Sequence, residues 1–168
     1  MPGSGHAVVA LGRLGSNALT FGSDLDLLFV FHAEDMEAQS TGRRSFIPTV
    51  YYNRLGQRLL GLITAPERLG ALYEVDTRLR PTGKDGPLAV STEAFARYYR
   101  ESAWSFEHMA LTKARTLYAD GQTGRVLEGL LPEAQLTGKD ATEVAADICS
   151  LRRKIAAEHP DDRLWDIK

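Results

Sequence analysis

Residues 22–31 have the sequence Gly22-Ser23-Asp24-Leu25-Asp26-Leu27-Leu28-Phe29-Val30-Phe31. From Leu25 onward this stretch is apolar apart from Asp26, and it is rich in strand-forming residues, so it predicts a buried β-strand. Residues two apart in a strand point to the same face, so we expect Asp24 and Asp26 side by side at the edge of a sheet. Two carboxylates at this spacing repel each other unless they share a cation or a proton. Their oxygens suit Mg²⁺, which takes one or two carboxylates plus substrate phosphates.

A glycine-containing turn precedes this strand. Residues 6–11 form a short apolar run that predicts a first buried strand, and Gly12-Arg13-Leu14-Gly15-Ser16-Asn17 follows directly. Glycine lets backbone N–H groups approach a phosphate closely. The turn lacks the Lys-Ser/Thr ending of a P-loop and a third glycine at dinucleotide-fold spacing, so alone it indicates an ordinary connection. The Asp24-x-Asp26 pair that follows makes it a more specific candidate for binding phosphate.

A third carboxylate lies on a second predicted strand. Residues 71–80 alternate between polar and apolar side chains, which predicts a half-buried strand. Its polar face carries Glu74, Asp76, Arg78 and Arg80. The plainer interpretation is a solvated face with weak ion pairs. The sharper hypothesis places Asp76 beside Asp24 and Asp26, with the two arginines reaching a polyphosphate and Lys84 of the following loop meeting an anion.

The rest of the chain predicts helices and one exposed loop. The expected helices cover residues 45–63 (with Ser45 as cap and Pro48 in the first turn), a segment beginning at Ser91, and residues 104–117, 121–131 and 140–158. The polar residues 32–44 predict the loop. Arg54 and Arg58 flank the apolar stripe of the first helix, where solvated surface is their default role. The pattern favours an α+β fold with a mixed sheet flanked by helices, divided into a catalytic core at residues 1–100 and a helical extension at residues 101–168.

Composition narrows the class of protein. The 168 residues are 43% hydrophobic and 25% charged, which predicts a folded core rather than disorder. A net charge of −2 argues against a general nucleic-acid binder. The single cysteine, Cys149, excludes an internal disulfide and a cysteine-based zinc site. We expect a cytoplasmic protein with no membrane segment, because no apolar run is long enough and residues 1–5 lack a signal-peptide pattern. The uncapped end at residues 164–168 suggests a fragment of a longer chain.

Together these features match the requirements of two-metal phosphoryl or nucleotidyl transfer. In that chemistry two ions about 3.5–4 Å apart contact the attacking and leaving oxygens, and carboxylates must converge to hold both ions. The glycine turn and the arginines would hold the phosphates that leave as pyrophosphate, because the planar guanidinium pairs with two phosphate oxygens.

The same residues resemble a known superfamily. The glycine turn with Ser23-Asp24-Leu25-Asp26 resembles the nucleotidyltransferase superfamily that includes DNA polymerase β. More narrowly, three segments in order resemble glutamine synthetase adenylyltransferase: residues 8–16 with 23–27, residues 72–83 and residues 103–115. The last two, with Tyr-Glu-Val-Asp and Ala-Trp-Ser-Phe-Glu-His-Met-Ala-Leu, look most like its C-terminal, adenylylating domain.

The resemblance implies a reaction in which ATP and a tyrosine of glutamine synthetase give adenylyl-tyrosine and pyrophosphate. It implies that Asp24 and Asp26 bind two Mg²⁺ ions and that Asp76 completes the site and takes the tyrosine proton. The phosphates would be held by a set drawn from the turn and the second strand: Gly12, Arg13, Gly15, Ser16, Ser23, Arg78, Arg80 and Lys84. The superfamily places Gly-Ser ahead of the acids; here Arg13 follows Gly12 and Ser16 follows Gly15, which leaves open which pair holds phosphate. A PII-type signalling protein is expected to act through the full-length enzyme.

Four alternatives remain open at this point. The chain could be the homologous domain that removes AMP by phosphorolysis, or an adenylyltransferase for another acceptor. It could be a module that senses nucleotides without catalysis, although sensing needs no two-metal site. Lastly, the Asp-x-Asp motif could be a chance feature of an ordinary α+β domain, which would leave the third acid and its two arginines unexplained.

Overall fold

The computed structural model describes residues 3–66, 70, 73–136 and 140–158. In these residues five strands form one mixed sheet. They are β1 (Ser4–Ala10), β2 (Leu25–Ala33), β3 (Val75–Asp76), β4 (Ala89–Ser91) and β5 (Arg115–Ala119). β1 lies antiparallel between β2 and β5, while β3 and β4 both pair in parallel with β2, at opposite ends of that strand. The predicted mixed sheet is confirmed, and β2 is its central strand.

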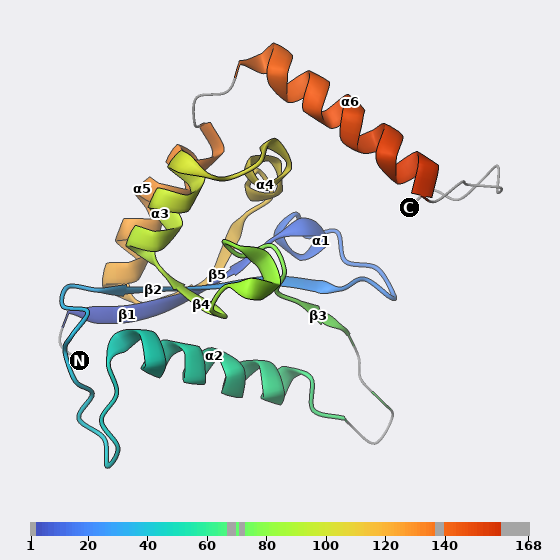
Figure 1. Cartoon of the computed structure of the whole chain (residues 1–168). Coiled ribbons are helices and arrows are strands. Elements are labelled where there is room, and N and C mark those ends of the chain that lie inside the picture. Colours follow the sequence, from blue (N-terminus) through green and yellow to red (C-terminus); the bar gives the residue numbers. More distant parts are fainter. Residues whose placement is uncertain (1–2, 67–69, 71–72, 137–139, 159–168) are drawn as a thin grey trace.

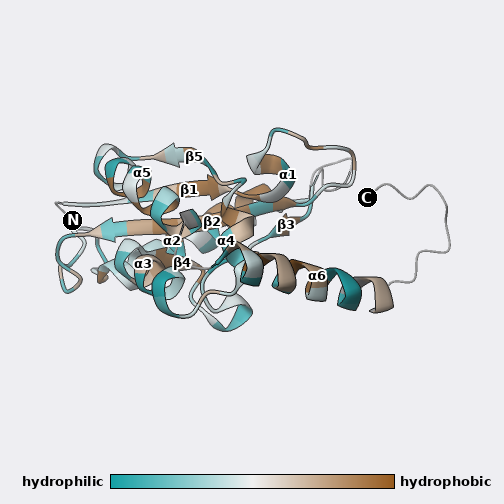
Figure 2. Cartoon of the chain, turned by 90° about the horizontal axis from the view of Figure 1, so that it is seen from above, coloured by the Kyte–Doolittle hydropathy of each residue, from teal (hydrophilic) through white to brown (hydrophobic). Residues whose placement is uncertain are grey.

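Helices cover both faces of this sheet. They are α1 (Gly12–Gly15), α2 (Pro48–Ile63), the 3₁₀ turn η1 (Gly83–Asp85), α3 (Thr92–Glu101), α4 (Ser105–Leu111), α5 (Gly121–Leu136) and α6 (Ala141–Glu158). α2 lies on one side of the sheet, and α3, α4 and α5 lie on the other (Figure 1). Seen from above, the apolar residues concentrate on the central strands (Figure 2).

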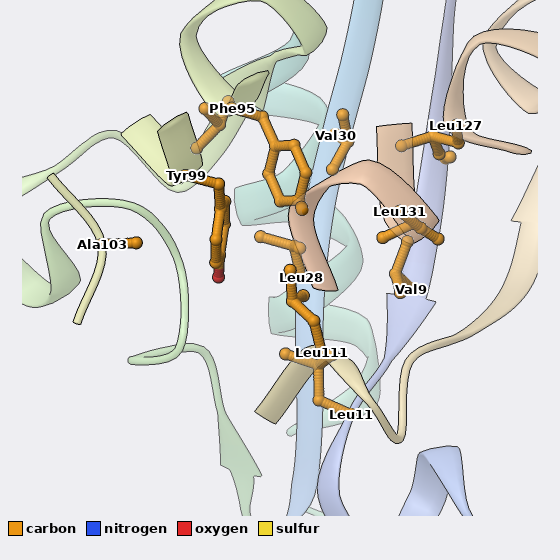
Figure 3. Packing of buried hydrophobic residues seen from close by; sticks show 13 residues of the cluster. Val9, Leu11, Leu28, Val30, Phe95, Tyr99, Ala103, Leu111, Leu127 and Leu131 are labelled. Carbon is orange, nitrogen blue, oxygen red and sulfur yellow. The ribbon is translucent and has the colours of Figure 1, made fainter. Parts of the chain in front are cut away.

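The core explains why β2 has so few polar residues. Leu28 and Val30 face the cluster that contains Val9, Phe95 and Leu127, shown in Figure 3. The alternate side chains, Leu27, Phe29 and Phe31, pack on the other face under α2. Because both faces of the strand are covered, a continuous apolar run is what the fold requires, and Asp26 can be accommodated only near its open end.

Several local predictions are wrong. The second strand was expected over residues 71–80, but in the described part of that range only Val75–Asp76 is a strand; residues 71–72 lie outside the described residues. The strand ends because the Asp76 carboxylate accepts a hydrogen bond from the backbone N–H of Arg78 at 2.7 Å, which turns the chain. The glycine turn is a single helical turn, α1, and Ser45 does not cap α2, whose N-cap is Ile47.

The helix expected over residues 104–117 ends earlier than predicted, because α4 stops at Leu111. Residues 115–119 form the edge strand β5, because pairing with β1 outweighs the weak helical pattern there. β4 was not predicted, and β2 extends through His32 and Ala33 into the expected loop. Ser91 does cap α3: its side chain accepts from the N–H of Ala94 at 3.1 Å, as expected. The division at residue 100 remains a prediction, although the sheet includes a strand from beyond it.

Candidate functional site

The three predicted acids lie at one end of the sheet. Asp24 is exposed and directly precedes β2, and Asp26 is the second residue of that strand. The parallel pairing of β2 with β3 sets Asp26 opposite Asp76. The chain reaches this arrangement by running along β2, back through α2 and again in the same direction through β3, so the two acids meet from distant parts of the sequence.

Asp26 is held in an unfavourable electrostatic environment. Burial raises the pKa of its carboxyl above the ordinary value, and the negative charges of Asp76 and Asp24 raise it further. Arg78 acts in the opposite direction but is the smallest of these influences. Such a site gains from any bound cation, because a cation removes the repulsion among the three acids.

Asp76 is in the opposite situation, because Arg78 engages both of its oxygens. Oδ1 accepts the backbone N–H of Arg78, and Oδ2 accepts Nε at 2.7 Å together with Nη2. The hydrogen bonds from the Arg78 side chain are the largest influence holding the pKa of Asp76 below its ordinary value. The ionised form of Asp76 is therefore favoured, and Arg78 takes three of the roughly four acceptor positions of its carboxylate.

The glycine turn packs directly against Asp26. Gly12 has a φ of +51°, and a Cβ added to it would lie 2.1 Å from Oδ2 of Asp26. The neighbouring N–H of Leu11 donates to the backbone oxygen of Asp26 at 2.9 Å. Gly15 is buried, and a Cβ there would lie 1.9 Å from the backbone oxygen of Lys113. At both positions a side chain would collide with a neighbouring group, so glycine is required. Gly12 in particular lets the turn pack directly against the carboxylate of Asp26.

The predicted phosphate-binding side chains of this region fall into two groups. Ser16 is exposed on the outside of α1, where its Oγ donates to the backbone oxygen of Gly12 at 3.1 Å. Ser23 is buried, and its Oγ accepts the N–H of Thr20 at 3.0 Å. Nη1 of Arg13 donates to the Thr20 hydroxyl at 2.7 Å and so links α1 to the loop before β2. In this arrangement Ser16 is open to a ligand, whereas Ser23 supports the loop.

A hollow of about 590 Å³ opens beside the acids. Its wall carries opposite charges, namely the carboxylates of Asp24, Glu74 and Asp76 and the cations of Arg78, Arg80 and Lys84. Arg80 lines this hollow while its guanidinium holds the adjoining loop, donating to the backbone oxygen of Thr77 at 2.7 Å and of Gly86 at 3.3 Å. Lys84 is exposed on η1. A space of this size with cations opposite acids suits a polyphosphate held against metal ions.

One supporting residue was not predicted from the sequence. Arg115, at the start of β5, donates from Nη2 to the backbone oxygen of Leu14 at 2.8 Å and from Nε to that of Gly15 at 3.1 Å. It therefore fixes the end of α1 from the far side of β1. In the sequence, the only sign of Arg115 was its place at the end of residues 103–115, the third segment that resembles the family. That place does not reveal that Arg115 contacts α1.

The donor set of the acids fits Mg²⁺, with one condition. Asp24 and Asp26 offer only oxygen ligands, which Mg²⁺ prefers, and one or two carboxylates are enough when phosphates supply the rest. Within the described ranges no three His, Cys, Asp or Glu side chains form a ready metal-binding cluster. Asp76 can join the other two as a ligand only if Arg78 releases its oxygens. Separately, no helix in the described part of the chain is long and apolar enough to cross a membrane.

Comparison with known proteins gives consistent matches. A family model described as glutamate-ammonia ligase adenylyltransferase matches residues 2–129. Over 167 residues the chain is 42% identical to the bifunctional glutamine synthetase adenylyltransferase/adenylyl-removing enzyme of Brucella suis, and 39% identical to the enzymes of that name in Agrobacterium fabrum and Rhizobium meliloti. Each match covers 99% of this chain but only 17% of the relative.

Proposed function

The chain belongs to the glutamate-ammonia ligase adenylyltransferase family, and on that premise we propose that it transfers AMP from ATP to a tyrosine of glutamine synthetase. The observation that carries this proposal is the register of β2 and β3, which sets Asp76 opposite Asp26 next to Asp24. A glycine turn against the same acids and a cation-lined hollow beside them are the other parts that nucleotidyl transfer needs.

In this proposal Asp24, Asp26 and Asp76 would hold two Mg²⁺ ions. When bound, the ions would neutralise charge that develops on the reacting phosphate and the leaving pyrophosphate. The raised pKa of Asp26 supports this assignment, because a carboxylate that is costly to ionise alone gains most from a cation.

The residues around the acids would hold the triphosphate. Backbone N–H groups of α1, with the exposed Ser16 hydroxyl, would face it from one side. Arg78 and Lys84 would face it from the other, across the hollow. Arg80 and Arg115 would act indirectly, since their guanidinium groups brace the two loops on which these groups lie.

Arg78 would change partners when ATP binds. Its guanidinium pairs with Asp76 in the absence of nucleotide, and the phosphates offer it a second set of oxygens with matching geometry. Leaving Asp76 would free its oxygens from the hydrogen bonds of Arg78, so that they could face a metal ion and the tyrosine hydroxyl. The tyrosine oxygen would then attack the α-phosphorus, its proton would pass to Asp76, and the bond to pyrophosphate would break.

The name of the relatives covers both addition and removal of AMP, so the direction of the reaction has to be proposed separately. Addition is favoured by the resemblance of residues 72–83 and 103–115 to the adenylylating domain. The chain spans 17% of the relatives' length. We place its action in the cytoplasm and assign any response to a PII-type signalling protein to the longer enzyme.

A labelling experiment separates the two directions. The chain is incubated with unmodified glutamine synthetase and ATP labelled in its α-phosphate, with Mg²⁺ or with chelator. Label on the synthetase that requires Mg²⁺ supports addition. Release of ADP from pre-adenylylated synthetase and inorganic phosphate, without labelling in the first assay, would instead identify the removing domain. Nucleotide binding with neither reaction would favour a sensing module.

Two variants connect the reaction to the third acid. Asp76→Asn should abolish labelling, because it removes a metal ligand and the proton acceptor together. Asp85→Asn is the matched control, since Asp85 is an exposed acid of η1 that does not line the hollow. Equal labelling by both variants would contradict the assignment of Asp76.

A further inference from the structure

A second pocket lies at the other end of the sheet from the acids. It has a volume of about 410 Å³ and opens between the first turns of α2 and the loop that connects β2 to α2. Ser4 lines it, and Ser4 pairs with Ala33 at the far end of β2. From Asp26 to Ala33 the strand covers roughly 23 Å at its usual rise, so the two sites are separate. Figure 1 shows this loop beside the start of α2, away from β3.

The charge of this pocket has one sign. Arg44, Arg54 and Arg58 line it, and none of its lining residues is acidic. Among the described residues, ion pairs join Arg78 to Asp76 and Arg100 to Glu133, so neither pair involves these three arginines. The chain as a whole carries a net charge of −2, so its composition does not explain the concentration. Three guanidinium groups around one hollow repel each other, and a bound anion would relieve that repulsion.

The walls of the pocket are held in place without a ligand. The guanidinium of Arg54 lies over the ring of Phe46, 4.2 Å from its centre. The loop is closed on itself, because the N–H of Phe46 donates to Oγ of Ser40 at 3.0 Å and the N–H of Ser40 donates to the backbone oxygen of Phe46 at 3.0 Å. Arg54 and Arg58 are four residues apart and therefore share one face of α2. A preformed site of this kind loses little conformational entropy on binding.

We propose that this pocket binds a small phosphate-bearing anion with two or more negative charges, at a site separate from Asp24, Asp26 and Asp76. Guanidinium groups pair with two phosphate oxygens each, and Thr41 adds a hydroxyl at the rim. The volume lies within the range of about 300–1,000 Å³ that is usual for small-molecule pockets. This inference does not depend on the proposed adenylyl transfer.

Calorimetric titration with inorganic tripolyphosphate tests the proposal. Chelator is present throughout, because without metal ions the carboxylates of Asp24, Glu74 and Asp76 in the other hollow repel a polyanion. Any binding that remains at the cations of that hollow is not changed by the substitutions in the pocket. The unmodified chain should bind one equivalent. The variant Arg54→Gln/Arg58→Gln should weaken binding at least about tenfold, since two guanidinium partners are lost. Arg43→Gln is the control for charge, because it removes one positive charge from the neighbouring loop at a residue that does not line the pocket. It is compared with the single variant Arg58→Gln, and it should change the affinity less than twofold.

Three results would overturn the proposal. One is the absence of saturable binding by the unmodified chain. Another is equal weakening by Arg43→Gln and by the pocket variant, which would indicate diffuse attraction to basic surface. The third is binding of citrate as tight as that of tripolyphosphate, which would remove the preference for phosphate. Arg54 also packs on Phe46, so replacing it could disturb the loop. Arg58→Gln alone is therefore made as a second variant that leaves this contact in place. Circular dichroism checks that both variants are folded.

Discussion

Asp26 lies directly opposite Asp76 in the parallel pair of β2 and β3, where burial and then the charge of Asp76 raise the pKa of Asp26. The same Asp76 has its own pKa lowered by Arg78. The charge of Asp76 is therefore compensated by Arg78, whereas the charge of Asp26 is left without such compensation and would be stabilised by a bound cation. This asymmetry leads to predictions about stability as well as activity.

Asp26→Asn should stabilise the metal-free protein at neutral pH. The pKa of Asp26 is raised in the folded state, so the unfolded chain loses this proton first and folding stability falls as pH rises through that interval. A neutral amide removes this cost. Urea unfolding should show a higher midpoint for Asp26→Asn at pH 7, and the difference should shrink below the ordinary carboxyl pKa of 3.8, where both side chains are neutral. A lower midpoint at pH 7 would contradict this electrostatic interpretation.

Arg78→Gln should destabilise the protein with the opposite dependence on pH. The lowered pKa of Asp76 means that its pairing with Arg78 contributes stability above the ordinary value of 3.8, and that this contribution is lost as pH falls through the folded pKa. Urea midpoints of the variant and the unmodified chain should therefore differ at pH 7 and converge in acid. The variant should also bind Mn²⁺, measured by electron paramagnetic resonance without nucleotide, more tightly than the unmodified chain. A parallel loss of stability at every pH would show that the pairing with Asp76 is not the cause.

Gly12→Ala should disrupt the site as well as the turn. The positive φ alone costs about 1–2 kcal/mol for a residue with a Cβ, and the new methyl group would also collide with the Asp26 carboxylate. Gly22→Ala is the control, because Gly22 has a φ of +76° but nothing within 4 Å of an added Cβ. Gly12→Ala should lose at least as much stability as Gly22→Ala, because it adds the collision to the cost of the positive φ. Adenylyl transfer should fall at least about tenfold more in Gly12→Ala, where the acid is displaced. If the two variants had similar transfer activities, Gly12 would not be part of the site.

Arg115→Lys should act on ATP binding through the glycine turn. A lysine lacks the planar guanidinium that donates in fixed geometry to the backbone oxygens of Leu14 and Gly15, so α1 should loosen. We expect a several-fold rise in KM for ATP with kcat less affected, and a loss of about 1–2 kcal/mol in the free energy of unfolding. Arg125→Lys is the control, because Arg125 donates to a backbone oxygen of α5 instead. A fall in kcat at unchanged KM would argue against a positioning role.

The central strand and its acids could be predicted because the evidence for them is local. The apolar run that contains Leu28 and Phe29 has no polar residue to place in water, so burial on both faces was the only consistent arrangement. The proximity of Asp26 and Asp76 was a hypothesis based on the types of residue and on the family resemblance, and the parallel pairing of β2 with β3 sets the two residues opposite each other.

The features that were missed depend on contacts that the pattern of apolar and polar residues does not show. β5 becomes a strand only because its partner β1 lies about 100 residues earlier in the chain, and the sequence near Arg115 shows no sign of that partner. The early end of β3 depends on one hydrogen bond from Arg78 to a carboxylate. The arginines of α2 were expected to be solvated surface and both are exposed, but only the folded loop around Phe46 shows that they share a pocket with Arg44.

The most direct measurement compares the variants Asp24→Asn and Asp26→Asn with the unmodified chain under identical conditions. It follows the Mg²⁺-dependent transfer of label from the α-phosphate of ATP to glutamine synthetase. Circular dichroism and urea unfolding establish beforehand that both variants are folded. We predict that labelling falls more than about 100-fold in each variant. Each substitution removes a carboxylate that would hold the metal ions, and the reacting phosphates need those ions to stabilise their charge. Labelling by either folded variant at the rate of the unmodified chain would contradict a nucleotidyl-transfer site built on these acids.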